Sequence, residues 1–169
     1  MSEEIFPLVN QSGEVIGKAP RSVCHNGSKL LHPVVHLHIF NSKGELFLQK
    51  RSAMKDVQPN KWDTAVAGHI DLGETVETAV LREAREELGI ENVEPVFIRK
   101  YIIETPTERE LSYCYYVTYE GAITLDCTEV ADGRYWRIEE IEQNMNKNIF
   151  TINFESDFET IIKDIVRKE

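Results

Sequence analysis

Three glutamates at helical spacing are the residues of this sequence best suited to chemistry. Glu83, Glu86 and Glu87 occupy positions i, i+3 and i+4, so a helix would place them within an arc of about 100° on one face. Carboxylate oxygens are the ligands that Mg²⁺ and Mn²⁺ prefer in proteins. A solvated acidic face has the same spacing, so the spacing alone leaves both interpretations open.

The helix that carries these glutamates is predicted over residues 75–88. Thr75 is a suitable N-cap, and Gly89 can end the helix in a left-handed conformation. Apolar residues recur every four positions on a face away from the glutamates: Val76, Val80, Ala84 and Leu88. This apolar stripe predicts that the helix packs against the core and turns its acidic face outward.

The segment 68–90, GHIDLGETVETAVLREAREELGI, resembles the signature of the Nudix hydrolases. Every fixed position of that signature is present, although Ala84 is small for its apolar position. The resemblance implies an α/β (α+β) fold, with a mixed β-sheet sandwiched between α-helices. It also implies an enzyme that uses Mg²⁺ or Mn²⁺ to cleave a diphosphate bond, as in a nucleoside diphosphate derivative or another small pyrophosphate.

The resemblance assigns roles within this segment. Glu83, Glu86 and Glu87 would bind metal with help from the Gly68 carbonyl, and bound cations would neutralise phosphate charge and activate a water. The other implied roles are structural: Glu74 and Arg82 brace the loop against the helix, and Gly68 and Gly73 allow a tight turn.

A catalytic base must also position or deprotonate the attacking water. Glu86 is the candidate within the signature, and some family members recruit a carboxylate from a later loop. Glu108, Glu110 and Glu129 are available for that role, although each is more readily interpreted as a surface acid.

Two residues outside the signature are candidates for contact with the substrate. Arg51 ends a predicted strand and is a reasonable phosphate contact, with an ordinary surface charge as the alternative. Trp62 has the ring to stack on a base, but packing in the core or at its rim is the favoured interpretation.

A narrower resemblance extends over the N-terminal two-thirds. The segments LVNQSGEVIG, HNGSKLLH, FNSKGELFLQKRS and KW are similar to those of isopentenyl-diphosphate isomerases and related hydrolases. These isomerases hold a second metal with three histidines and two glutamates. The resemblance implies a second site in this chain, formed by His25, His32, His69, Glu108 and Glu110. Alternatively, His25 and His32 are ordinary polar residues, and we interpret His36 and His38 as structural.

One position departs from the isomerase pattern. The isomerases need a cysteine in a segment that reads WDTAVAGHI here, and Ala67 occupies its place. The signature also keeps all its hydrolytic carboxylates. We therefore predict a hydrolase, with an isomerase as the alternative and a non-catalytic nucleotide-binding Nudix module as a third hypothesis.

Length and composition fit one domain over residues 1–169, with an N-terminal hairpin and short helix in residues 1–30. A net charge of −10 argues against a nucleic-acid polymer as partner. No apolar run is long enough for a membrane span, and the acidic N-terminus does not resemble a signal peptide. Three cysteines without CxxC spacing favour reduced thiols in the cytoplasm. A homodimer remains an open expectation.

The remaining elements are predicted from period-2 patterns and turn residues. Residues 52–61 are predicted to form a loop, and residues 155–167 an amphipathic helix with Phe158, Ile161, Ile162 and Ile165 inward. A short helix is expected to open at Pro20, and residues 33–40 and 45–50 to form a hairpin. Strands are expected at 5–9, 14–18, 33–40, 45–50, 64–67, 93–104, 111–119 and 135–138.

Overall fold

The computed structural model describes residues 2–168, and a mixed seven-stranded sheet forms its centre. Strand β3 (Leu31–Phe40) is the middle of this sheet, and all ten of its residues are buried. On one edge β3 pairs in parallel with β8 (Arg109–Thr118), and on the other it pairs antiparallel with β6 (Val66–His69). The sheet continues from β8 to β7 (Val96–Glu104).

A second group of strands extends from the far end of β3. Here β4 (Leu46–Arg51) pairs antiparallel with both β5 (Trp62–Thr64) and β9 (Val130–Trp136). Only Phe40 and Leu46 pair between β3 and β4, so the predicted hairpin is wrong beyond its turn. The chain diverges there because β4 takes β5 and β9 as its partners instead.

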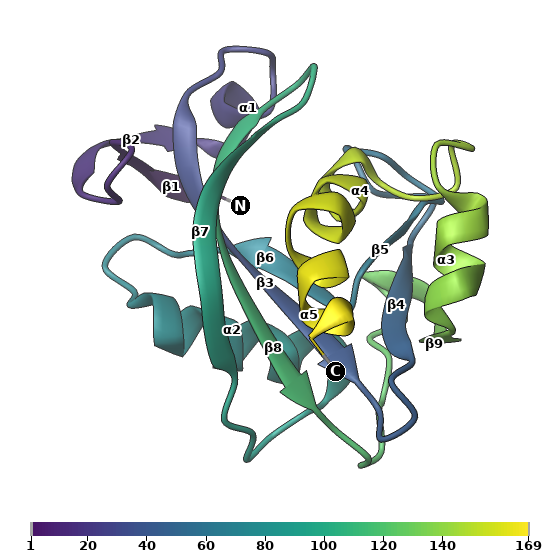
Figure 1. The fold of residues 1–169 in the computed structure, drawn as a ribbon. Coiled ribbons are helices and arrows are strands. Elements are labelled where there is room, and N and C mark those ends of the chain that lie inside the picture. Colours follow the sequence, from purple (N-terminus) through teal and green to yellow (C-terminus); the bar gives the residue numbers. More distant parts are fainter. Residues whose placement is uncertain (1, 169) are drawn as a thin grey trace.

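Helices cover both faces of this sheet (Figure 1). On one face, α2 (Val76–Leu88) buries Ala79, Val80, Ala84 and Leu88 against alternate residues of β3. The other face is covered by the C-terminal helical segment, α4 (Ile152–Asp157), a π-helical turn (Phe158–Ile162) and α5 (Lys163–Arg167). The mixed sheet between helices that the sequence predicts is confirmed.

The N-terminal segment forms a separate small sheet beside β3. Strand β1 (Ile5–Val9) pairs antiparallel with β2 (Val15–Pro20), and the short helix α1 (Arg21–Cys24) follows directly. Val9 packs with Leu31 and Leu111, which attaches the hairpin to β3 and β8. The predicted hairpin and short helix are both present.

Two predicted strands need correction. The strand predicted over residues 64–67 is divided into β5 and β6 at Ala65, because β5 pairs with β4 whereas β6 pairs with β3. The strand predicted over residues 135–138 is the end of β9, and Ile138 instead begins α3 (Ile138–Asn144), which the sequence analysis missed.

The C-terminal helix begins earlier than predicted. Its first residue is Ile152, because the Thr151 hydroxyl accepts a hydrogen bond from Phe154 N at 3.0 Å and caps the helix. Phe158, Ile161 and Ile162 are buried as expected. None of the helices within residues 2–168 combines the length and the hydropathy that a membrane-crossing helix requires.

Candidate active site

The acidic face of α2 borders a cleft of about 690 Å³. Glu83, Glu86 and Glu87 line this cleft together with Gly68 of β6. Most of the other lining residues are charged: Glu4, Arg21, Arg51, Lys55, Asp71, Arg82, Asp126 and Glu129. The structure therefore brings the four residues expected to bind metal to one opening.

The three glutamates differ strongly in burial. Glu87 is 9% exposed, whereas the Glu86 side chain is 53% exposed. Burial, reinforced by the charge of Glu83, raises the pKa of Glu87 well above its ordinary value, although Gln49 Nε2 donates a hydrogen bond to it at 2.6 Å. Burial also raises the pKa of Glu83 to about 7, against the opposing effect of Arg82. Buried carboxyl groups whose pKa is raised in this way ionise more readily when a cation is bound beside them.

Gly68 is required because the Glu83 carboxylate packs directly against it. A Cβ at this position would lie 2.2 Å from Cδ of Glu83. Gly73 has a φ of +84°, as expected for a tight turn, whereas Gly68 is not in the left-handed region. The expected tight turn is therefore confirmed at Gly73 and wrong at Gly68. Glycine is needed at position 68 because the Glu83 carboxylate approaches its backbone closely.

Arg82 connects the loop before α2 to the glutamates of α2. Its Nε and Nη2 atoms donate to the two carboxylate oxygens of Glu74 at 2.7 and 2.9 Å, and Nη2 also donates to the His69 carbonyl at 3.0 Å. The Nη1 atom contacts Glu83 at 2.9 Å and Glu86 at 3.2 Å. This contact set is the brace that the resemblance implies for Glu74 and Arg82.

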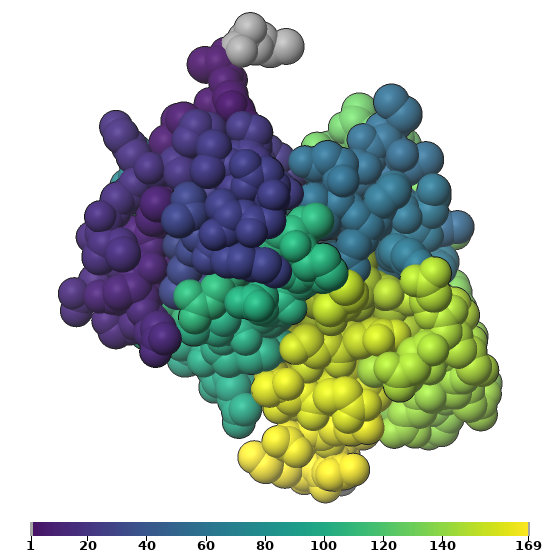
Figure 2. Space-filling model, turned by 90° about the horizontal axis from the view of Figure 1, so that it is seen from above, coloured from purple at the N-terminus to yellow at the C-terminus, as the bar shows by residue number. Residues whose placement is uncertain are grey.

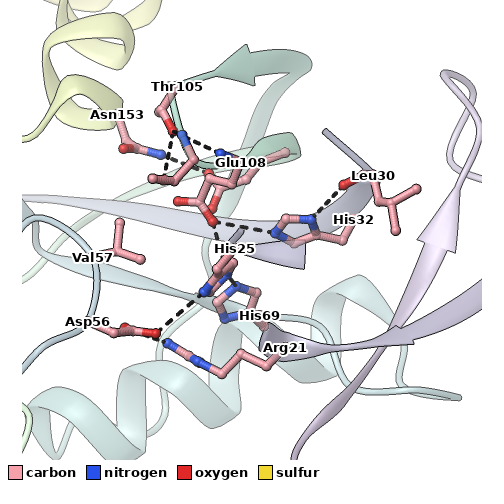
Figure 3. Close-up of polar contacts among 12 residues, drawn as sticks. Arg21, His25, Leu30, His32, Asp56, Val57, His69, Thr105, Glu108 and Asn153 are labelled. Carbon is pink, nitrogen blue, oxygen red and sulfur yellow. Dashed lines mark hydrogen bonds and ion pairs between the residues drawn. The ribbon is translucent and has the colours of Figure 1, made fainter. Parts of the chain in front are cut away.

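A second cluster lies where β3, β6, the residue after α1 and the turn before β8 meet. Figure 3 shows His25 and His32 directed toward the Glu108 carboxylate, with His69 beside His25. One ligand atom from each of these residues lies within 4.8 Å of all the others: His25, His32, His69 and Glu108. Four of the five residues implied for a second metal site are therefore gathered in space.

The orientations within this cluster suit a cation. His32 Nδ1 lies 3.0 Å from the Leu30 carbonyl and can only donate to it, so Nε2 is the ring nitrogen that faces Glu108, 3.6 Å away. His25 Nε2 lies 3.2 Å from His69 Nε2 and 2.9 Å from Glu108 Oε2. Such convergence of nitrogen and oxygen lone pairs is repulsive unless a proton or a cation lies between them.

Two buried imidazole nitrogens of this cluster have no hydrogen-bond partner within residues 2–168: His25 Nδ1 and His32 Nε2. An unsatisfied buried polar atom costs about 1–3 kcal/mol. Three imidazoles and a carboxylate are ligands that Zn²⁺ and Mn²⁺ accept. The residues present therefore fit a divalent metal.

Glu110 lies apart from the four clustered residues. It is 6% exposed, and one of its oxygens accepts a hydrogen bond from Asn153 Nδ2 at 2.8 Å. Glu108 is also buried, at 4% exposed, so the interpretation of both as surface acids is wrong. Glu129 is half exposed and forms an ion pair with Lys55 at the rim of the larger cleft.

Arg51 and Trp62 have structural partners. Arg51 Nε donates to the Val57 carbonyl at 3.0 Å and Nη1 to Asp63 at 3.2 Å, which ties the loop of residues 52–61 to β5. Trp62 packs edge-on against Trp136, with ring centroids 5.2 Å apart, as the packing interpretation predicts. Arg51 still lines the cleft, so its role in binding phosphate stays a prediction.

The loop of residues 52–61 also borders the site from above. In Figure 2 this loop, in blue, and the N-terminal segment, in purple, lie on the same face, with the green turn between β7 and β8 beside them. Arg21 joins the two segments through a 3.3 Å ion pair with Asp56. The sequence analysis missed Arg21, Gln49 and Asn153, because each is joined to its partner only by the fold.

A family model of the NUDIX domain matches residues 30–155 of this chain. The chain belongs to the Nudix family. It is 36% identical over 154 residues to an uncharacterised Nudix hydrolase of Listeria monocytogenes, which covers 82% of this chain and 83% of that one. It is also 30% identical over 152 residues to the isopentenyl-diphosphate Δ-isomerase of Citrobacter koseri, which covers 86% and 84%.

Solved Nudix structures have the same fold. A crystal structure from Deinococcus radiodurans has a TM-score of 0.74 and 25% identity, with 98% of each chain covered. A MutT protein of Methanosarcina mazei has a TM-score of 0.69 and 23% identity, covering 80% and 95%. Family membership and these relatives make this Nudix protein an enzyme of the hydrolase type, and Nudix hydrolases generally use divalent metals.

Proposed function

We propose that this Nudix protein hydrolyses a diphosphate linkage in a small organic pyrophosphate such as a nucleoside diphosphate derivative, and that the reaction requires Mg²⁺ or Mn²⁺. The observation that carries this proposal is the convergence of Glu83, Glu86 and Glu87 on the larger cleft. Within residues 2–168, Glu87 forms no ion pair with lysine or arginine, although it is buried. A divalent cation is the partner that such an arrangement lacks.

The chain's own residues divide the work. Glu83, Glu87 and the Gly68 carbonyl would hold the cation, and Arg82 fixes the position of α2 against β6. Glu86, the most exposed of the three, keeps an oxygen free to orient the attacking water and accept its proton. The bound cation supplies charge neutralisation of the phosphates and lowers the pKa of that water.

Basic residues on the opposite rim suit the phosphate groups. Arg51 and Lys55 line the cleft across from α2, and both are tied to neighbouring acids that limit their freedom. The fold neighbour from Shewanella oneidensis was solved with ADP-ribose, at a TM-score of 0.62, 17% identity and coverage of 80% and 86%. We expect a small diphosphate to bind here in the same general manner.

The experiment is a panel of pyrophosphates with added Mg²⁺ or Mn²⁺, read out as released phosphate. Glu86→Gln and Glu87→Gln should each lower kcat by about 100-fold or more, since losing about 3 kcal/mol of transition-state stabilisation has that effect. Glu91→Gln, on an exposed acid just past α2, is the matched control and should keep full activity. Near-normal turnover in both site variants would remove the proposed metal site.

We also propose a second metal site at His25, His32, His69 and Glu108, with Glu110 nearby. The support is the convergence of their lone pairs and the unpaired buried atoms described above. His69→Asn should lower bound Mn²⁺ or Zn²⁺ by one ion per chain in an elemental analysis, whereas His38→Asn should not. Equal metal content in the two variants would argue against this site.

An isoprenoid diphosphate isomerase is the alternative enzyme, and the similarity to the Citrobacter koseri isomerase favours considering it. Ala67 argues against it, because a methyl group cannot exchange a proton with carbon. Incubation with isopentenyl diphosphate separates the two activities, since an isomerase would form the dimethylallyl isomer. Metal-dependent binding across the panel without turnover would instead support a non-catalytic module.

A further inference from the structure

A smaller cavity of about 60 Å³ adjoins the larger cleft. The two share the wall formed by Ala67, Gly68 and His69 of β6, together with Arg21 and Arg51. A cavity of this volume accommodates only a few groups the size of a water molecule. A substrate with its diphosphate in the larger cleft would place only the first few atoms of its organic part here.

The lining of this cavity is mainly polar. Beyond the shared wall, its apolar residues are Val34 and Val57. Three of its polar residues belong to the proposed second metal site or lie beside it: His25, Glu108 and Glu110. The others are His36, Gln58, Asp63 and Asn153. A pocket of this composition suits an oxygen-bearing group better than a hydrocarbon, because an apolar occupant would leave polar groups unpaired.

His36 is the residue in this cavity that no step of the proposed hydrolysis uses. Its Nδ1 atom lies 2.6 Å from Asp157 Oδ2 and 3.1 Å from Ser112 Oγ. Both hydrogen bonds that the ring makes therefore involve Nδ1, and Nε2, on the far edge of the ring, remains for the cavity that His36 lines.

The Asp157 carboxylate, which belongs to the C-terminal helical segment, fixes the orientation of this ring. It is fully buried in α4, and its second oxygen accepts a hydrogen bond from Tyr101. Burial disfavours an imidazolium, but the Asp157 carboxylate outweighs burial and raises the pKa of His36 well above its ordinary value. Because a carboxylate only accepts, Nδ1 is the nitrogen that donates to Asp157, and Nε2 is the ring nitrogen left for another partner.

The strand register places His36 beside the shared wall. His36 pairs directly with Ala67 across the β3–β6 ladder, and directly opposed side chains have Cβ atoms about 4.5–5.5 Å apart. Ala67 contributes only a methyl group, so space remains above it for an atom of the substrate next to the imidazole.

We propose that His36, oriented by Asp157, forms a hydrogen bond through Nε2 with the organic part of the substrate and selects diphosphates that carry a hydroxyl close to the phosphates. A hydroxyl one or two carbons from the diphosphate fits the volume of the cavity. This inference rests on the proposed function for the position of the diphosphate, and it identifies His36 as a specificity-determining residue.

The test compares 2-hydroxyethyl diphosphate with ethyl diphosphate, which differ only in the hydroxyl oxygen. Binding to the full chain with Mg²⁺ is measured by calorimetry, and hydrolysis is measured separately. Wild-type protein should bind the hydroxylated compound at least about tenfold more tightly. His36→Leu should lose this preference and keep its affinity for ethyl diphosphate within about threefold. Thr64→Val, a buried polar-to-apolar change outside the cavity, is the control and should keep the preference.

A measurement on wild-type protein covers the case in which His36→Leu does not fold. The imidazole ¹⁵N signal of His36 Nε2 should shift with 2-hydroxyethyl diphosphate and not with ethyl diphosphate. Equal shifts, equal affinities, or no binding of either compound would overturn the inference. Binding with the preference but without hydrolysis would overturn only the proposed hydrolysis, whereas hydrolysis without the preference would overturn only the role of His36.

Discussion

At the residue scale, the site depends on how far each carboxylate is withdrawn from water. Glu87 is almost completely buried, Glu83 less so, and Glu86 faces the cleft. Because desolvation penalises the charged form, the inner two acids depend on a bound cation more than the outer one does. In the proposed function, one helical turn would thus provide two ligands for a cation and one carboxylate free to act on water.

The absence of a side chain at position 68 is a residue-scale requirement. In Gly68→Ala the added methyl group would displace the Glu83 carboxylate, and we expect Mn²⁺ affinity to fall at least about tenfold in a calorimetric titration. The free energy of unfolding should change little, because the Gly68 backbone is not in the left-handed region. Unchanged Mn²⁺ affinity would contradict this explanation of Gly68.

Gly44→Ala is a control that introduces backbone strain without a steric contact at the site. Gly44 has a φ of +75°, and a Cβ there would meet nothing within 4 Å. This variant should lose about 1 kcal/mol of stability through backbone strain and should bind Mn²⁺ normally. The pair of variants separates steric contact at the site from conformational strain in a distant turn.

At the element scale, α2 is held in place by its caps as well as by its apolar stripe. The Thr75 hydroxyl accepts a hydrogen bond from Thr78 N at 3.2 Å, and Gly89 ends the helix at a φ of +64°. Thr75→Ala should therefore lower the free energy of unfolding by about 1 kcal/mol in urea titrations. Thr78→Ala keeps the capping hydroxyl and should cost less, and an equal loss in both variants would contradict the capping role.

The sequence predicts α2 well because its signals are local. The cap, the four-residue apolar spacing and the C-terminal glycine all lie within the segment itself, and the structure has each of them. Strand pairing is less predictable. No residue pattern within 62–69 indicates that the strand before Ala65 pairs with β4 and the strand after it with β3. Helix α3 was missed for a related reason, since it follows β9 without a separating turn.

The second cluster was found by resemblance and not by spacing. His25, His32, His69 and Glu108 span more than eighty positions of the chain, and no periodic pattern connects them. Asp157 could not have been connected to His36 at all, because the two residues are 121 positions apart and only the C-terminal helix brings them together. The signature residues were predictable, whereas the residues that surround them depend on tertiary contacts.

At the scale of the whole molecule, Asp157 joins the C-terminal helix to the central sheet, and its contribution to stability should depend on pH. The His36 charge, outweighing burial, lowers the pKa of Asp157 below its ordinary value of 3.8, so its contribution is present above that pH and is lost as the pH falls. The pKa of His36 is raised above 6.5, so its contribution is complete below 6.5 and is lost as the pH rises through the raised value.

The two effects overlap between about pH 4 and 6.5. There we expect Asp157→Asn to lower the free energy of unfolding by about 3 kcal/mol, the cost of breaking a buried ion pair. The difference from wild type should shrink toward pH 3 and toward high pH in urea titrations at fixed ionic strength. A difference that stays constant from pH 3 to pH 8 would contradict a charged Asp157–His36 pair.

Strand β6 lies between the metal-binding cleft and the polar cavity and lines both of them. Its middle residues face the metal-binding cleft and the polar cavity at once, so a substitution there would disturb both the cleavage of the diphosphate and the recognition of its organic part. Substitutions that alter substrate choice without affecting cleavage are therefore expected in the loop of residues 52–61 and at the start of α4. Val57, Gln58 and Asn153 of these segments line the polar cavity and not the cleft, so a change there would leave the metal-binding cleft intact.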